Sequence, residues 1–134
     1  MKYKPNNGEE LKALCDDESV YLGDIDTSLI TDMSELFDGS SRTDFSGIES
    51  WDVSKVENMS YMFCSAKFFN HPINSWDVSR VKSMSFMFVY SSFNQPLDSW
   101  NIANCEDRLG MFLLSPFSHP LESWGDKNPF KQDI

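Results

Sequence analysis

A chain of 134 residues is long enough for one domain that buries about two thirds of the surface its unfolded form exposes. Its formal net charge is −10, and between Glu9 and Asp38 ten acids accompany a single base, Lys12. The negative electrostatic field of these acids repels polyphosphate, which excludes nucleic acid as a partner. The same field favours a basic protein partner, unless the acids only keep the chain soluble.

The first 21 residues predict an N-terminal cap. They start with MKYKPNN and lack the apolar stretch of a signal peptide, and no later segment approaches the ~18 apolar residues of a membrane span. We therefore expect a cytoplasmic chain without membrane insertion; the cell surface is the alternative if a leader has been replaced by Met1. Acids in the first turn and Leu11 with Leu14 or Cys15 on one side predict a short helix from Gly8 to Asp16.

A repeat of 24 to 26 residues follows. Trp51, Trp76, Trp100 and Trp124 are 25, 24 and 24 residues apart, and they close the related phrases FSGIESW, FNHPINSW, FNQPLDSW and FSHPLESW. The segment from Leu22 aligns in the same register, with Ile25 in the tryptophan position. Copies therefore start near residues 22, 48, 73, 97 and 121.

Aligned copies give eight apolar columns, which predict the core. The columns are Leu22, Ile48, Ile73, Leu97, Leu121; Ile25 and the four Trp; Thr27, Val53, Val78, Ile102; Ile30, Val56, Val81, Cys105; Met33, Met59, Met84, Arg108; Leu36, Met62, Met87, Met111; Phe37, Phe63, Phe88, Phe112; and Phe45, Phe69, Phe93, Phe117.

Each copy predicts a short strand and a short helix. The spacing in Ile73-x-x-Trp76-x-Val78 suits a strand of a leucine-rich-type repeat, whereas Val81, Met84 and Met87 fall on one face of a two-turn helix. Ser54 and Glu57 resemble a helix capping box. The sequence thus predicts an α/β repeat solenoid, leucine-rich-repeat-like, with four to five coils over residues 22–124, an N-terminal cap over 1–21 and a polar tail over 125–134, and a monomer is expected.

The phrase F-N-x-P-L-x-S-W-D-V-S-x-V-x-x-M-S-x-M-F resembles the BspA-like bacterial surface protein 26-residue repeat family, a leucine-rich-repeat-like domain of unknown function. The resemblance covers about Leu22 to Trp124. It implies a bacterial protein with a right-handed repeat solenoid, often displayed on the surface to contact proteins or a host. It brings no catalytic residue, and the missing export signal departs from the family's usual location.

Two polar rows beside the predicted strands are candidate partner-binding surfaces. One alternates Ser50, Ser75, Ser99 and Ser123 with Asp52, Asp77 and Asn101. Its acids fit partner contact, but a carboxylate two residues before Ser54 or Ser79 also fits a turn that accepts backbone amides. The second row stays polar or acidic while varying, which suits partner contact: Glu49, Asn74, Asp98, Glu122.

Tyr61 and Phe86 form the third candidate surface. They lie about 140° round the predicted helix from Val56 and Val81, so they either anchor a partner or stack on each other across neighbouring coils.

No metal, cofactor or catalytic group is expected. His71 and His119 occupy equivalent positions two copies apart, roughly 10 Å at the spacing of stacked strands, which is too far to share a metal ion. The methionine columns fit core packing better than a soft-metal site. Three cysteines match neither a disulfide framework nor a metal-ligand spacing, so free thiols are expected, and the common catalytic motifs are absent from the sequence.

The leading function hypothesis is therefore a non-catalytic protein-interaction module that binds an unidentified, basic protein through an acidic surface. The alternatives are an acidic inhibitor or immunity-type protein for a basic enzyme or toxin, and a structural fragment of an adhesin-type repeat array.

Overall fold

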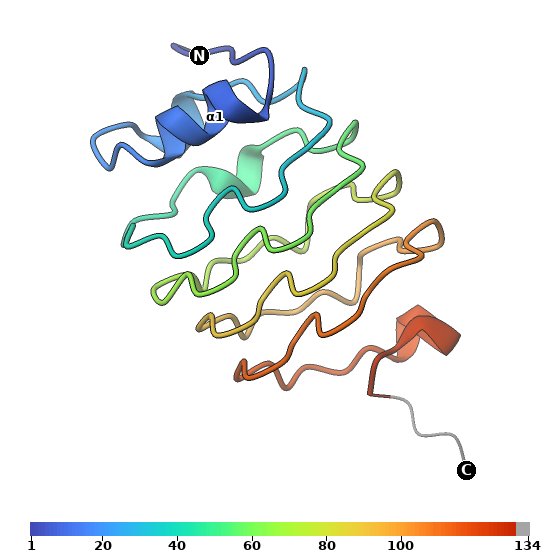
Figure 1. Cartoon of the computed structure of the whole chain (residues 1–134). Coiled ribbons are helices and arrows are strands. Elements are labelled where there is room, and N and C mark those ends of the chain that lie inside the picture. Colours follow the sequence, from blue (N-terminus) through green and yellow to red (C-terminus); the bar gives the residue numbers. More distant parts are fainter. Residues whose placement is uncertain (131–134) are drawn as a thin grey trace.

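The computed structural model describes residues 1–130 as a stack of turn-rich coils, one for each copy of the repeat (Figure 1). Its only regular elements are one α helix, α1 (Gly8–Cys15), and three short 3-10 helices, η1 (Leu22–Asp24), η2 (Ile48–Ser50) and η3 (Glu122–Lys127). The helix α1 covers the N-terminal end of the stack and η3 lies at the other end. Residues 131–134 of the predicted polar tail lie outside the described residues.

The predicted α/β solenoid of leucine-rich-repeat type is wrong. Within residues 1–130 there is no strand. Isolated parallel bridges stand in its place; they link Asp32 to Asn58, Asn58 to Ser83 and Ser83 to Asp107, and a fourth bridge joins Tyr3 to Ile25. The helices predicted from the spacing of Val56 and Val81 onward are absent too. The short helix predicted from Gly8 is present as α1, with Asn7 as its N-cap.

A backbone ladder takes the place of those helices. We call residues 33–39, 59–65, 84–90 and 108–114 the ladder segments. The amides of residues 33, 35, 37 and 39 donate to the carbonyls of residues 58, 60, 62 and 64 in the next coil at 2.8–2.9 Å. A helix would need these amides for its own i→i−4 bonds. Because they bond along the stack instead, each segment becomes a run of overlapping turns that still points its i and i+3 residues into the core.

Two left-handed residues in each ladder segment also exclude a helix. The third residue has φ of 55–62° in every segment, at Glu35, Tyr61, Phe86 and Gly110, and the seventh has φ of 57–68°, at Gly39, Ser65, Tyr90 and Leu114. Left-handed backbone costs a non-glycine residue about 1–2 kcal/mol, so the ladder bonds and the core packing must offset that strain. No apolar spacing reveals such positions.

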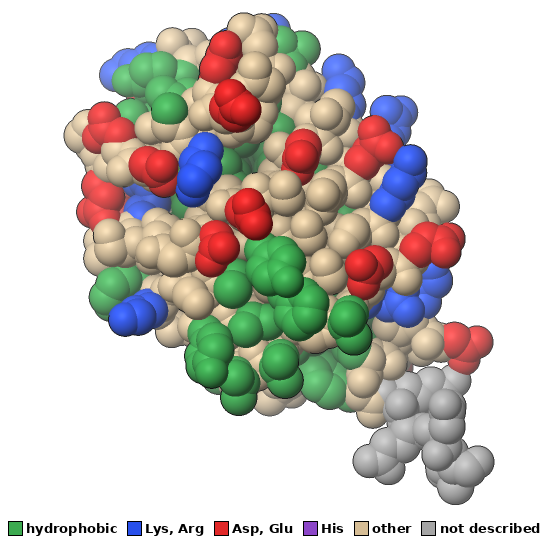
Figure 2. Space-filling model, viewed as in Figure 1, with side chains coloured by type: hydrophobic (Ala, Val, Ile, Leu, Met, Phe, Trp, Pro, Cys, Tyr) green, Lys and Arg blue, Asp and Glu red, His purple; other side chains and the backbone are tan. Residues whose placement is uncertain are grey.

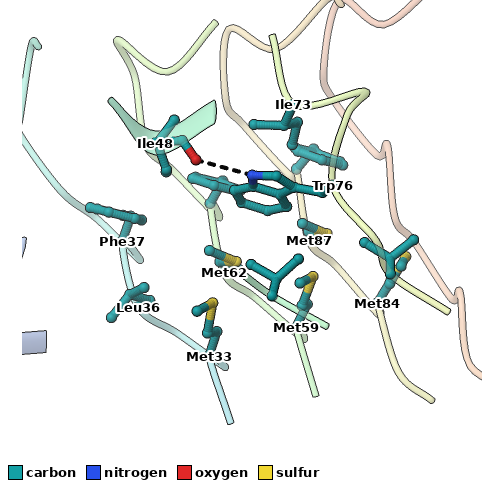
Figure 3. Close-up of a cluster of buried hydrophobic side chains, with 14 of the residues drawn as sticks. Met33, Leu36, Phe37, Ile48, Met59, Met62, Ile73, Trp76, Met84 and Met87 are labelled. Atoms are coloured by element: carbon teal, nitrogen blue, oxygen red, sulfur yellow. Dashed lines mark hydrogen bonds between the residues drawn. The ribbon is translucent and has the colours of Figure 1, made fainter. Parts of the chain in front are cut away.

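The predicted strands are replaced by turns that hold the tryptophans. The amide of Trp76 donates to Ile73 O in its own coil, whereas its indole N–H donates to Ile48 O of the preceding coil at 3.0 Å (Figure 3). The other three tryptophans repeat this bond at 2.8–3.1 Å. On this side of the stack, side chains therefore make the contacts that a sheet would make with its backbone.

The predicted core is confirmed, with one exception. Every residue of the eight columns is buried except Arg108, whose guanidinium donates to Cys105 O and Lys127 O. The rings of Phe37, Phe63, Phe88 and Phe112 stack along the axis with centroids 5.5–5.8 Å apart and planes within 5°. Methionines and Trp76 fill the space beside them (Figure 3). The methionine columns are therefore core packing.

Candidate functional site

The aspartates of the first polar row hold turns. Asp52 accepts the amide and the hydroxyl of Ser54 at 3.0 and 2.6 Å, and Asp77 bonds Ser79 in the same way. These hydroxyl and amide bonds lower the pKa of both carboxyls. Asn101 makes the equivalent bond to the amide of Ala103. The capping box predicted at Ser54 and Glu57 is wrong, because no helix follows it and Ser54 bonds backwards to Asp52.

The second polar row is linked from coil to coil. Asn74 donates to Asp98 at 3.0 Å and accepts the amide of Ser99. Glu49 lies 2.8 Å from His71 Nε2 and accepts the amide of Gly47. Burial alone would raise the pKa of Glu49, but its hydrogen bonds outweigh that effect and lower it. Glu122 is exposed at the end of the row.

Tyr61 and Phe86 stack on each other across neighbouring coils. Their ring centroids are 5.1 Å apart and their planes differ by 22°. A Cβ atom at Gly110, the next residue in this column, would lie 2.5 Å from the Phe86 ring, so the ring covers that backbone directly. Tyr61 keeps 38% of its surface exposed. The stacking alternative is thus confirmed, and the pair still presents an aromatic surface to solvent.

The ladder segments carry a surface that the sequence analysis missed and that is at least partly exposed at all of its positions except Ser85 and Val89. We call the residues at their second, third, sixth and seventh positions the turn face. Along the stack this face reads Ser34, Glu35, Asp38, Gly39; then Ser60, Tyr61, Cys64, Ser65; then Ser85, Phe86, Val89, Tyr90; and finally Leu109, Gly110, Leu113, Leu114.

The turn face therefore changes from acidic to apolar between the first coil and the last. Tyr90, Leu109, Leu113 and Leu114 are 54–69% exposed, which is unusual for large apolar side chains that lie together. Figure 2 shows hydrophobic side chains gathered on this side of the molecule, with acids between them and α1. Aligning the polar columns as well as the apolar ones would have exposed this change.

An alternating row of charges borders the ladder segments. Lys82 Nζ lies 2.8 Å from Glu57, and a shallow groove of about 490 Å³ continues past Arg80 to Asn104 and Glu106. Hydrogen bonding to Glu57 raises the pKa of Lys82, and the same bond lowers the pKa of Glu57. This mixed charge gives the groove no preference for one sign of ligand.

Of the three thiols, Cys15 and Cys105 are buried and Cys64 is half-buried. Burial raises the pKa of Cys15 to about 12, and it also raises the pKa values of Cys64 and Cys105. All three are free thiols. His119 contacts Asn94 O rather than a second imidazole. Among residues 1–130, no group of three or more His, Cys, Asp or Glu could hold a metal ion, and none of the helices there is long and apolar enough to cross a membrane.

A buried arginine ties the first coil to its cap, and the sequence analysis did not identify it. Arg42 is 3% exposed and donates to the carbonyls of Cys15, Asp17 and Val20. Its isolated position among polar residues gives no periodic signal. The link holds the chain that follows α1 against the first coil.

Repeated coils, matched columns and inter-coil bonds define the class: this is a tandem-repeat protein. The chain belongs to the family described as "Mycoplasma protein of unknown function, DUF285", whose model matches residues 10–127. No curated protein and no solved structure matches it.

Proposed function

We propose that this chain is a non-catalytic module that binds a protein partner. The observation that carries the proposal is the turn face, where exposed aromatic and leucine side chains meet an acidic surface. Contiguous apolar side chains on a soluble surface mark interaction sites, and buried aromatic rings supply much of the binding energy in protein interfaces. Tyr61 and Phe86 form the centre of this surface, and their mutual stacking holds the rings in place before a partner arrives.

The acids favour a basic partner. Glu35 and Asp38 are exposed on the acidic part of the turn face, and Glu9 and Glu10 are exposed nearby on α1. Ion pairs at 3.6–3.8 Å offset Asp16, Asp24 and Asp26 in this region, with Lys12, Lys2 and Lys4 as their partners. The remaining field accelerates encounter with a positively charged protein and weakens as salt rises.

The second polar row is a secondary contact surface in this proposal. Asp98 and Glu122 are exposed, and each lies within reach of a partner that covers the edge of the stack. Asp52, Asp77 and Asn101 contribute less, because turn amides already occupy their side-chain oxygens.

Two narrower functions fit the same surface. An acidic inhibitor or immunity-type protein for a basic enzyme or toxin is supported by the net charge of −10. An adhesin-type surface repeat, with a closer relationship to the BspA-like repeats and a bacterial origin, is supported by the W-D-V-S and M-x-x-M-F phrases. The first assigns the chain to the cytoplasm and the second to the cell surface.

A pull-down from the source cell at low and high salt tests the proposal. We expect a stoichiometric protein partner that is lost or weakened at high salt. The double variant Tyr61→Ser and Phe86→Ser should reduce capture at least tenfold, while the matched control Asp52→Asn and Asp77→Asn, which preserves the turn acceptors, should not. Absence of a partner at both salt concentrations would refute the proposal, and thermal denaturation checks that all variants fold.

A further inference from the structure

The last ladder segment, residues 108–114, has backbone donors without acceptors. In the earlier segments alternate amides donate to the next coil, as Tyr61 does to Ser85 O and Phe86 does to Leu109 O; among residues 1–130 only Tyr90, at a seventh position, lacks this bond. The equivalent amides of Gly110, Phe112 and Leu114 have no acceptor among residues 1–130. An unpaired row of this kind is a template for pairing with another chain.

This open edge offers donors alone. The carbonyls of Arg108, Gly110 and Phe112 accept amides within their own turns, from Met111, Leu113 and Ser115. Two copies that met through this edge would therefore place donor against donor. The edge needs a segment that offers carbonyl oxygens at alternate residues.

The first coil of a second copy does not offer such carbonyls freely. Its outward side is covered by α1, and Lys12 Nζ donates to the carbonyls of Glu35 and Leu36 at 3.4 and 3.3 Å. Gly8 also lies against Asp32 O, where a Cβ atom would approach to 2.9 Å. Head-to-tail stacking of copies is thus blocked by the cap, and the occupant must be a different polypeptide.

Phe130 covers the inner part of the edge. The Phe130 ring lies 5.6 Å from Phe112 and 6.1 Å from Phe117, in the place of the next ring in the stack. The outer part, from Gly110 to Leu114, keeps Leu113 and Leu114 54% and 61% exposed. Within the described part of the chain, amide donors without an acceptor and exposed leucines therefore lie side by side in one short segment.

We propose that residues 108–114 form a docking edge for an extended segment of a partner protein. The partner's alternate carbonyls accept the amides of Gly110, Phe112 and Leu114, and its apolar side chains pack on Leu113 and Leu114. This mode continues the ladder that already joins the coils and resembles strand addition to a sheet edge. It rests on the proposed function only in requiring that a protein partner exists.

A peptide of residues 83–91 of this chain is a suitable probe. In the protein, the carbonyls of Ser85, Met87 and Val89 accept the amides at the third, fifth and seventh positions of the preceding ladder segment, which are equivalent to Gly110, Phe112 and Leu114, so the peptide carries the required acceptors. We expect it to slow amide hydrogen exchange at Gly110 and Leu114 at least tenfold, as measured by NMR, without slowing exchange at Tyr61. A version of the peptide that is N-methylated at the alternate amides that point away from the docking edge should bind equally well, because the edge requires no hydrogen-bond donor from its ligand.

The double variant Leu113→Ser and Leu114→Gly should weaken peptide binding at least tenfold while folding normally, since glycine suits the φ of 57° at position 114. The matched control is the exposed Lys67→Ser in the second coil, outside the turn face, which should bind as the wild type does. No peptide binding, binding without protection at Gly110 and Leu114, or equal binding by the double variant would each overturn the docking edge. A partner captured equally by wild type and double variant would refute this edge but leave the proposed function standing.

Discussion

The indole hydrogen bonds between coils make a measurable contribution to stability, and Trp76→Phe tests it. The substitution removes the N–H that donates to Ile48 O at 3.0 Å. Both residues are buried, at 4% and 0% exposure, so water does not readily replace the donor. Ile48 O keeps its bond from the Trp51 amide, so the loss is that of one net hydrogen bond, about 1 kcal/mol, rather than the larger cost of an orphaned carbonyl.

The smaller ring adds a packing term. The ring centroid of Trp76 lies 6.4 Å from those of both Phe63 and Trp100. Phenylalanine at position 76 leaves part of that space empty, which lowers the free energy of unfolding by about 1–2 kcal/mol. We therefore expect the free energy of unfolding to fall by about 2–3 kcal/mol, measured by urea denaturation with an unchanged m-value.

A shape-matched analogue separates the two contributions. Benzothienylalanine at position 76 replaces the indole N–H by sulfur and keeps the ring volume, so it should lose only the hydrogen-bond part, about 1 kcal/mol. If the analogue is as stable as the wild type, the indole bond does not stabilise the stack and the reasoning fails.

Three other predictions concern the turns and thiols. Asp77→Asn should leave the free energy of unfolding at pH 7 nearly unchanged, and Asp77→Ala should lower it by about 0.5–1 kcal/mol. Because Ser79 lowers the pKa of Asp77, the carboxylate's contribution to stability is complete above about pH 4 and is lost as the pH falls through that lowered pKa. If the wild type is more stable than Asp77→Ala by the same amount at pH 7 and at pH 2, this account is wrong. Ellman's reagent should modify only Cys64 quickly in the folded protein and all three thiols in urea, and rapid native reaction of all three would show that the core opens. Ser65→Gly should raise the free energy of unfolding by up to about 1 kcal/mol, because φ is 58° there and the first coil already has Gly39 in that place; a decrease in urea midpoint would show that the Ser65 backbone is not strained.

Columns of apolar residues were predictable from the sequence because burial depends on which residues recur. The register of Met33, Met59 and Met84, and of the tryptophans, follows from spacing alone, and the structure buries all of them. The position of the N-terminal helix was predictable for a similar reason, since acids and apolar spacing coincide from Gly8 onward.

Backbone conformation was not predictable from those columns. The positions of Val81, Met84 and Met87 fit a helix and a run of turns equally well, because both bring i and i+3 to one side. The choice depends on whether the amide of Phe86 bonds its own segment or the next coil, and that is a long-range contact which local propensity does not encode.

The candidate site was predicted in part for related reasons. Stacking between Tyr61 and Phe86 followed from equivalent places in adjacent copies. The leucines at 113 and 114 were missed because their columns begin with polar residues, Asp38 and Gly39, and only the last copies are apolar. Asp52 and Asp77 were ambiguous from sequence because one carboxylate can serve either a turn or a partner.

The backbone ladder has a consequence for how proteins of this kind diversify. Its rungs join main-chain atoms, so they place no demand on the side chains of the turn face beyond tolerance of a left-handed residue. Glu35, Tyr61, Phe86 and Gly110 occupy one geometry with four unrelated chemistries. Under the proposed function, recognition and folding are encoded in separate sets of positions, so an array of such coils can acquire a new ligand by surface mutation while its architecture stays the same.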